Sequence, residues 1–206
     1  MVLWRKNKVM LIVNDILFNL EKKWGKFAKI GRAFCNQQMP FISDKAYLNV
    51  LYEPQTTAIQ EVFNSLGCNV LPELLDFYKK YNGCRLFFSS LNIFGIQCFE
   101  EEIYEPFDLA LENHIIQETF KDNNYVFFAS LGGDYAFAYK KDDCSKIYAV
   151  KKGKKKVLKV FESFDSWFSY YFDALYEEYD EEGQKKHPNK RYKEIPALYH
   201  ETQKFF

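Results

Sequence analysis

Residues 71–83, with the sequence LPELLDFYKKYNG, constrain the fold of this chain more than any other segment. Pro72 suits the first turn of a helix, where its missing N–H costs nothing. Asn82 and Gly83 supply a stop that can adopt the left-handed conformation. Between them, apolar side chains recur at helical spacing, at Leu71, Leu74, Leu75, Tyr78 and Tyr81. The segment therefore predicts a helix that ends sharply, and the aromatic run at 86–88 predicts that a strand follows.

Three further segments have helical patterns. Residues 57–66 predict a short helix that Gly67 ends. Residues 9–27 predict an amphipathic helix whose apolar side is formed by Ile12, Ile16, Leu17, Leu20, Trp24 and Phe27. A long final helix is predicted over 163–180, with Ser163 as its N-cap. Its wide apolar face consists of Phe164, Trp167, Phe168, Tyr171, Leu175 and Tyr179.

The strand signals follow the helix at 71–83. Residues 102–120 are predicted to combine loop with a short helix. Residues 31–56 lack periodicity and contain Pro40 and Pro54, so they predict a loop-rich joint. Strands are predicted at 85–90, 92–98, 125–130, 134–140, 146–151 and 156–161, with a hairpin turn at 151–154. This order favours an α+β fold, a mostly antiparallel sheet with helices grouped on one face. We expect a helical N-terminal extension at 1–54, a domain at 55–182 and a basic C-terminal tail at 183–206.

The composition excludes several classes of protein. With 48% hydrophobic and 19% aromatic residues, the chain is far too apolar to be disordered. Its five cysteines are scattered, without the spacing of a zinc site or a disulfide framework, so we expect reduced, mostly buried thiols. Asn14 and Asp15 interrupt the N-terminal apolar run, and no window reaches the ~18 apolar residues that span a bilayer. We therefore expect a cytoplasmic protein without membrane contacts.

The order of signals in 55–180 resembles the SUKH superfamily, which includes fungal cell-wall synthesis regulators and bacterial toxin-immunity proteins. The matching pieces are the helix that ends at Asn82 and Gly83 with its strand pair, the segments 106–109, 128–130 and 133–137, and Phe161-Glu162-Ser163-Phe164-Asp165-Ser166-Trp167 at the start of the last helix. The resemblance implies a SUKH-like domain and a non-enzymatic role. Bacterial relatives typically bind a cognate toxin and block it, whereas others act as protein-interaction modules. The family has no general catalytic apparatus.

Catalytic and cofactor motifs are poorly supported. His114, His187 and His200 share no metal-ligand spacing, so we expect no metal site. Gly132 and Gly133 lack the lysine and the following helix of a phosphate loop, and a turn between strands explains them better. We expect no enzymatic activity and no cofactor.

The charge distribution is uneven although the net charge is zero. Residues 140–159 contain nine lysines and two aspartates, whereas 161–182 contain eight acids and 99–120 seven, without Lys or Arg. The lysines could bind nucleic acid, but two acidic segments would repel a polyanion, so a solvated hairpin that protects a sheet edge is the simpler interpretation. The acids at the end of the last helix stand where the helix dipole favours cations, which suggests internal pairing or a basic partner.

We therefore expect an immunity protein that neutralises a cognate toxin domain, a nuclease being one class that fits. The alternatives are a regulatory interaction module and a nucleic-acid-binding protein that uses the hairpin at 140–159. The candidate contacts with a partner are Glu100, Glu101, Glu102, Asp134, Tyr135, Glu177, Glu178, Asp180 and Glu181.

Overall fold

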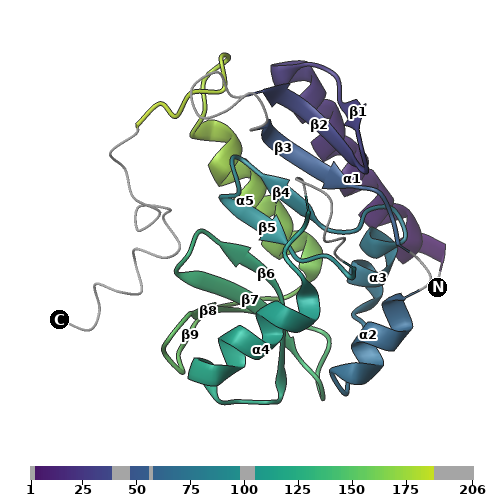
Figure 1. The fold of residues 1–206 in the computed structure, drawn as a ribbon, viewed down its shortest axis with the longest axis vertical. Coiled ribbons are helices and arrows are strands. Elements are labelled where there is room, and N and C mark those ends of the chain that lie inside the picture. The colour runs from purple at the N-terminus through teal and green to yellow at the C-terminus, as the bar shows by residue number, and fades with distance from the viewer. Residues whose placement is uncertain (1–2, 39–46, 56–57, 98–104, 188–206) are drawn as a thin grey trace.

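The protein folds around a nine-stranded antiparallel sheet in which each strand pairs with the next one along the chain (Figure 1). The computed structural model describes residues 3–38, 47–55, 58–97 and 105–187. In these residues the strands are β1 (Ala28–Ile30), β2 (Ala33–Gln38), β3 (Tyr47–Tyr52), β4 (Cys84–Leu86), β5 (Leu91–Ile93), β6 (Tyr125–Leu131), β7 (Tyr135–Lys140), β8 (Ile147–Lys151) and β9 (Val157–Phe161). The helices are α1 (Leu3–Trp24), α2 (Ile59–Ser65), α3 (Pro72–Tyr78), α4 (Leu109–Phe120) and α5 (Phe164–Glu177).

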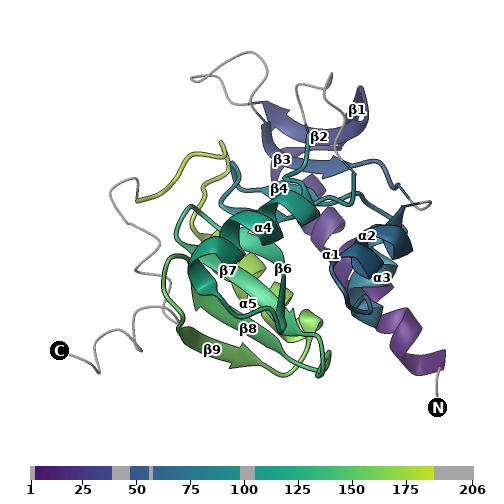
Figure 2. The same cartoon turned by 60° about the horizontal axis from the view of Figure 1, so that its bottom comes forward.

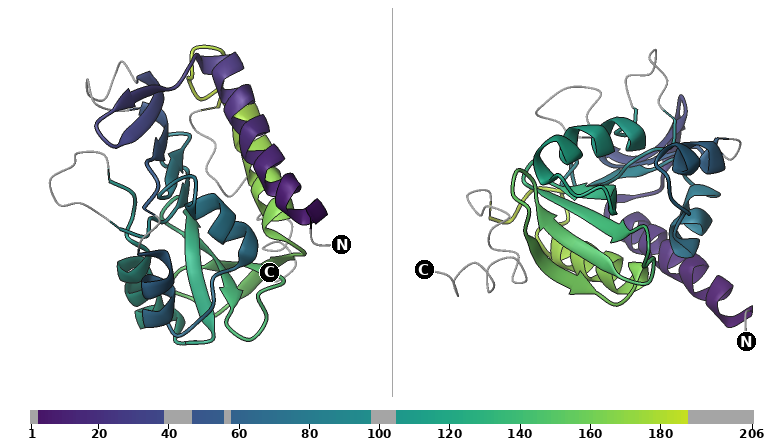
Figure 3. Two further views of the ribbon diagram at one scale, coloured as in Figure 1. Left: turned by 90° about the vertical axis from the view of Figure 1, so that its right-hand side faces the viewer. Right: turned by 90° about the horizontal axis from the view of Figure 1, so that it is seen from below.

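The expected α+β class, antiparallel sheet and N-terminal helix are confirmed. Helices α1, α3 and α5 lie together on one face, but α4 lies on the opposite face from α5 (Figures 2 and 3). The central strands explain why both faces need cover. Successive residues of β7 are buried, with the aromatic rings of Phe137 and Tyr139 alternating with Ala136 and Ala138. Such a run, buried on both faces, requires a second layer, and α4 provides it.

Aromatic packing holds α5 against the sheet. The ring of Trp167 lies 4.9 Å from that of Phe128 and 5.1 Å from that of Phe137, between centroids. The predicted apolar face is confirmed, because all six of its side chains are buried. Ser163 is the N-cap, as expected, and forms a reciprocal capping box with Ser166, with N–O distances of 3.1 Å in both directions.

The prediction of a loop-rich joint at 31–56 is wrong where the structure describes these residues. Strands β2 and β3 occupy most of the described part and extend the sheet beyond β4. The prediction failed because two buried asparagines, Asn36 and Asn49, interrupt the apolar pattern by which a strand is recognised. Asn49 Nδ2 donates to Asn36 Oδ1 at 3.0 Å, and Asn49 Oδ1 accepts from the Phe87 N–H at 3.1 Å. Tertiary hydrogen bonds satisfy these side chains, so polar residues stand at core positions.

The turn after α3 forms as predicted, although α3 itself ends at Tyr78. Gly83 has a φ of +84°, and a Cβ at this position would lie 2.6 Å from the Ile93 carbonyl oxygen. Asn82 Oδ1 accepts from the Ile96 N–H at 2.7 Å and so fixes the segment that follows β5. Strands β4 and β5 are shorter than expected because Phe87, Phe88 and Ser89 turn through positive φ values of 52°, 56° and 60°.

The described cysteines are free, and two of them, Cys35 and Cys84, are buried. Burial raises the pKa of the Cys84 thiol from 9.0 to about 12. Because the folded state disfavours the thiolate, the stability that the neutral thiol provides is fully present below pH 9. It is lost as the pH rises toward 12.

We expect the free energy of unfolding to fall between pH 9 and pH 12, and Cys84→Ala to reduce that slope because it removes one titrating group. Urea unfolding at several pH values measures both effects. A slope identical in the variant and the wild type would contradict the assignment to Cys84.

Replacing Trp167 with alanine should destabilise the protein by about 3–5 kcal/mol, because it leaves a large cavity between α5 and the sheet. The matched control is Phe18→Ala, since this ring is 64% exposed and its loss should change stability by less than about 0.5 kcal/mol. Thermal and urea unfolding measure the difference. Equal effects of the two substitutions would contradict this packing.

Candidate functional site

The acids at the end of α5 and just after it form the candidate site, which we call the acidic end (Glu177, Glu178, Asp180, Glu181 and Glu182). They surround the carboxyl end of the helix, where carbonyl groups lack intrahelical donors. Glu177, Glu181 and Glu182 are exposed, whereas Glu178 and Asp180 are half-buried. The structure thus brings together four of the predicted site residues, together with Glu182.

A lysine from α1 caps this helix end. Lys23 Nζ donates to the carbonyl oxygens of Tyr176 at 3.0 Å and Tyr179 at 2.7 Å. It also lies 4.3 Å from the centroid of the Tyr176 ring, and 4.8 Å from that of Trp24. Burial lowers the pKa of Lys23, and the nearby charge of Lys186 adds to that effect. A cation therefore occupies the position that the helix dipole favours, and it offsets the cost of the acids around it.

The segment after the helix is fixed by contacts to α1, β2 and itself. Trp24 Nε1 donates to the Asp180 carbonyl at 3.1 Å, and Gln37 Nε2 donates to the Glu182 carbonyl at 2.5 Å. Asp180 Oδ1 accepts from the N–H groups of Glu182 at 3.1 Å and Gln184 at 2.7 Å. These bonds hold the acidic end in one arrangement.

Two of the acids are therefore committed to internal contacts. Glu178 pairs with Lys185 at 3.5 Å, and Asp180 closes the turn. Glu177, Glu181 and Glu182 remain as outward-facing carboxylates. Sequence reasoning recognised the acids but missed Lys23, Trp24 and Gln37, because nothing in their local pattern indicates a contact about 150 residues away.

The other predicted contact residues lie elsewhere. Glu100, Glu101 and Glu102 fall outside the described residues. Asp134 is exposed in the turn between β6 and β7, as expected for a turn residue, and its carbonyl accepts from the Lys152 N–H at 2.7 Å. Tyr135 is only 4% exposed and belongs to the core, so it offers little area to a partner.

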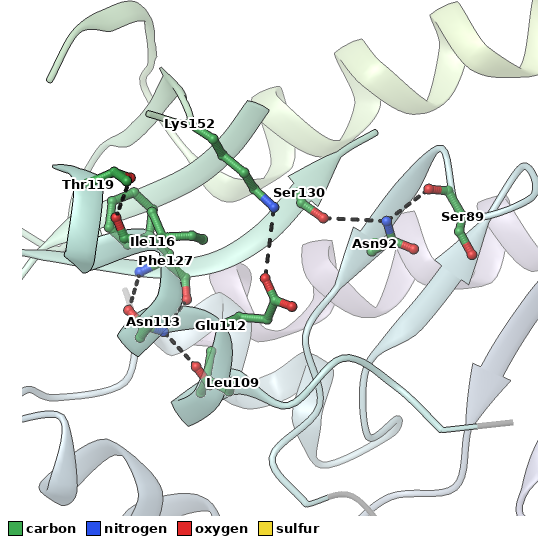
Figure 4. A network of polar contacts seen from close by, with 10 residues as sticks. All are labelled: Ser89, Asn92, Leu109, Glu112, Asn113, Ile116, Thr119, Phe127, Ser130 and Lys152. Atoms are coloured by element: carbon green, nitrogen blue, oxygen red, sulfur yellow. Dashed lines mark hydrogen bonds and ion pairs between the residues drawn. The ribbon is translucent and has the colours of Figure 1, made fainter. Parts of the chain in front are cut away.

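The lysine-rich hairpin between β8 and β9 is partly neutralised by neighbouring acids. Lys152 Nζ lies 3.8 Å from Glu112 Oε2 of α4 (Figure 4), and Lys155 Nζ lies 3.5 Å from Asp122 Oδ2. Lys146, before β8, pairs with Glu162 at 3.6 Å. These pairs lower the positive potential that a phosphate backbone would meet, so the geometry does not favour the nucleic-acid interpretation.

A row of three polar side chains crosses the sheet on the face away from α5. Arg85, Asn92 and Ser130 are direct cross-strand neighbours on β4, β5 and β6, and we call them the polar row. Asn92 Nδ2 donates to the Ser89 carbonyl at 2.9 Å and to Ser130 Oγ at 3.4 Å (Figure 4). Sequence reasoning missed this row, because it depends on strand register.

Metal and membrane features are absent from the described part of the chain. No group of three or more His, Cys, Asp or Glu side chains there could hold a metal ion. His114 and His187 are exposed, and His200 falls outside the described residues. No helix in the described ranges combines the length and apolarity needed to cross a bilayer.

A known family matches the segment that runs from α2 into α5. The sequence model of the SMI1 / KNR4 family (SUKH-1) matches residues 54–170. The chain belongs to this family. The match begins after β3 and ends within α5, so α1, β1–β3 and the acidic end lie outside the matched SUKH-1 region. No curated protein matches the chain.

The Lys23 cap yields a direct test. Lys23→Met keeps the length of the side chain but leaves two carbonyls at the end of α5 without their donor, so it should destabilise the protein by about 1.5–3 kcal/mol. Lys22→Met is the control, because Lys22 is exposed on the same helix and should cost less than about 0.5 kcal/mol. Urea unfolding compares the two variants, and equal stabilities would contradict the cap.

Proposed function

We propose that this SUKH-1 protein is a non-enzymatic immunity protein that binds a cognate bacterial toxin domain and blocks it. The observation that carries the proposal is the acidic end, in which Glu177, Glu181 and Glu182 face outward from a segment held by hydrogen bonds. A fixed segment loses little conformational freedom on binding, which favours affinity.

The charge of the acidic end selects the partner. Exposed carboxylates attract a basic surface, and toxins that cleave nucleic acids are basic where they contact phosphates. Charge complementarity of this kind accelerates association and suppresses wrong partners. A nuclease domain is therefore the toxin class that fits this surface best.

The internal contacts refine which acids would bind. The pair between Glu178 and Lys185 and the turn closed by Asp180 already use two carboxylates. Within the described residues the remaining three form no ion pair, so they can meet a partner without breaking one there. Their reversal should therefore affect binding more than folding.

Replacing Glu177, Glu181 and Glu182 with lysine should slow association with the toxin encoded beside the gene in its native host by about tenfold at low salt. The difference should shrink as the salt concentration rises, because salt screens exposed charges. Stopped-flow or surface plasmon resonance measurements at several salt concentrations test this.

The control reverses Asp15, Glu61 and Glu118, three exposed acids on α1, α2 and α4, and so changes the net charge equally. It should slow association much less. If both variants behaved alike, net charge rather than the acidic end would steer binding, and the proposed contact surface would be wrong.

A further inference from the structure

We propose that the outer edge of β9 receives an extended, acidic segment of a protein partner, which pairs with β9 as an additional strand. β9 is the last strand of the sheet, and within the described residues it pairs with β8 only (Figure 2). Such an edge strand presents N–H and C=O groups that can pair with another chain. The site goes beyond the proposed function, because it needs neither the acidic end nor a basic toxin.

The side chains along this edge form an apolar strip, which consists of Val157 and Val160. These valines are 36% and 41% exposed. Their cross-strand neighbours are Val150 and Tyr148, which stand two positions apart on β8 and therefore share a face. The irregular register beside Ala149 takes up the extra residue of β9, so two valines three positions apart lie on the same face. A partner strand would therefore meet two neighbouring β-branched side chains.

The apolar strip stays exposed because α4 covers only part of its face. The alternate residues of β9 point toward α5, since Phe161 packs on Tyr170 of that helix at a centroid distance of 5.6 Å. The apolar strip therefore lies on the face of α4. There Tyr148 packs on Tyr125 at 5.4 Å, and Tyr125 packs on Phe120, the last residue of α4, at 5.2 Å. The helix ends before it reaches the two valines.

Lysines often protect a sheet edge from pairing, but here they leave the valines uncovered. Lys159 is the only charged residue of β9, and its Nζ lies 4.1 Å from the centroid of the Tyr170 ring on α5. Its side chain thus extends over the face opposite to the apolar strip. In the hairpin before β9, Lys155 is drawn to Asp122 at 3.5 Å. Apolar side chains at an accessible edge favour pairing rather than protection.

The charge around this edge selects an acidic partner. Lys159 in the middle of β9 and Lys154 in the hairpin form no ion pair in the described part of the chain. Carboxylates on an added strand can therefore meet these cations without displacing an internal acid. The same charges argue against a second copy of this chain, because pairing of β9 with itself would bring the lysines of two copies together.

The two faces of β9 specify the pattern of the partner segment. Successive side chains of a strand point to opposite faces, so the segment should alternate apolar and acidic residues. Its apolar side chains would cover the apolar strip, and its carboxylates would lie on the face of Lys159.

The test is an NMR titration of the full chain, labelled with ¹⁵N, with the peptide acetyl-Glu-Val-Glu-Val-Glu-amide, which matches this pattern. The peptide should shift the backbone amide signals of β9 saturably. The same peptide with its three internal amides N-methylated should bind about tenfold more weakly, because it cannot donate to the strand. Acetyl-Lys-Val-Lys-Val-Lys-amide should also bind about tenfold more weakly, because the lysines repel it.

A pair of variants places the site on the chain. Val160→Asp should weaken binding about tenfold, because it removes apolar contact and adds a like charge to the edge. The matched control is Leu111→Asp, since Leu111 is 56% exposed on α4 and its replacement should leave binding of the peptide unchanged. The comparison of the three peptides uses the wild-type protein, so it holds whether or not a variant folds.

Four outcomes would overturn the proposal. Equal binding of the N-methylated peptide would exclude strand pairing, and equal binding of the lysine peptide would exclude selection by charge. Signals of β9 that broaden with protein concentration in the absence of peptide would assign the edge to a second copy. Slow hydrogen exchange of every β9 amide in the free protein would mean that another segment of the chain already covers the edge. None of these outcomes bears on the acidic end.

Discussion

The contact of Trp167 with β6 and β7 links the sheet to the helices, because a continuous series of aromatic rings extends from it to α1. Along α5 the series continues through Phe168 and Phe172, and from Phe172 it reaches Phe87 in the turn after β4, at a centroid distance of 5.5 Å. Phe87 in turn lies 6.0 Å from Trp24 of α1. The helix that precedes the SUKH-1 match is thus packed into the same core as the last helix. Each such pair adds to the stability gained from buried area.

Buried asparagines form hydrogen bonds with backbone groups inside this apolar core that have no strand partner. Asn113 of α4 accepts from the Phe127 N–H at 2.8 Å and donates to the Phe127 carbonyl at 2.6 Å. Phe127 lies beyond the end of β5 in the sheet, where the register of β6 is irregular, so its backbone needs another partner. The same amide donates to the Leu109 carbonyl at 2.8 Å and thereby fixes α4 against β6 (Figure 4). A side chain with two donors and an acceptor replaces the missing strand.

The sequence predicts the elements whose patterns are local. The face of α5, the cap at Ser163 and the turn at Gly83 follow from spacing and backbone chemistry, and the structure contains all three. The strands β2 and β3 could not be predicted, because Asn36 and Asn49 stand at core positions and their compensation comes from distant residues. The need for a second layer such as α4 follows from the uninterrupted apolar run of β7, a signal that is present in the sequence.

The candidate sites likewise combine features that are visible in the sequence with features that only the structure shows. The acids after α5 are visible as a run of charge, but the distinction between committed and outward-facing carboxylates depends on Lys23, Lys185 and Gln37. The polar row is invisible without the register, because its members are separated by up to 45 positions in the chain.

A net charge of zero therefore conceals an uneven distribution of charge. The chain neutralises much of its lysine-rich hairpin internally, through Glu112 and Asp122, and it caps the end of α5 with Lys23. Within the described residues no ion pair neutralises Glu177, Glu181 or Glu182, so the negative potential at the end of α5 stays available to a basic surface.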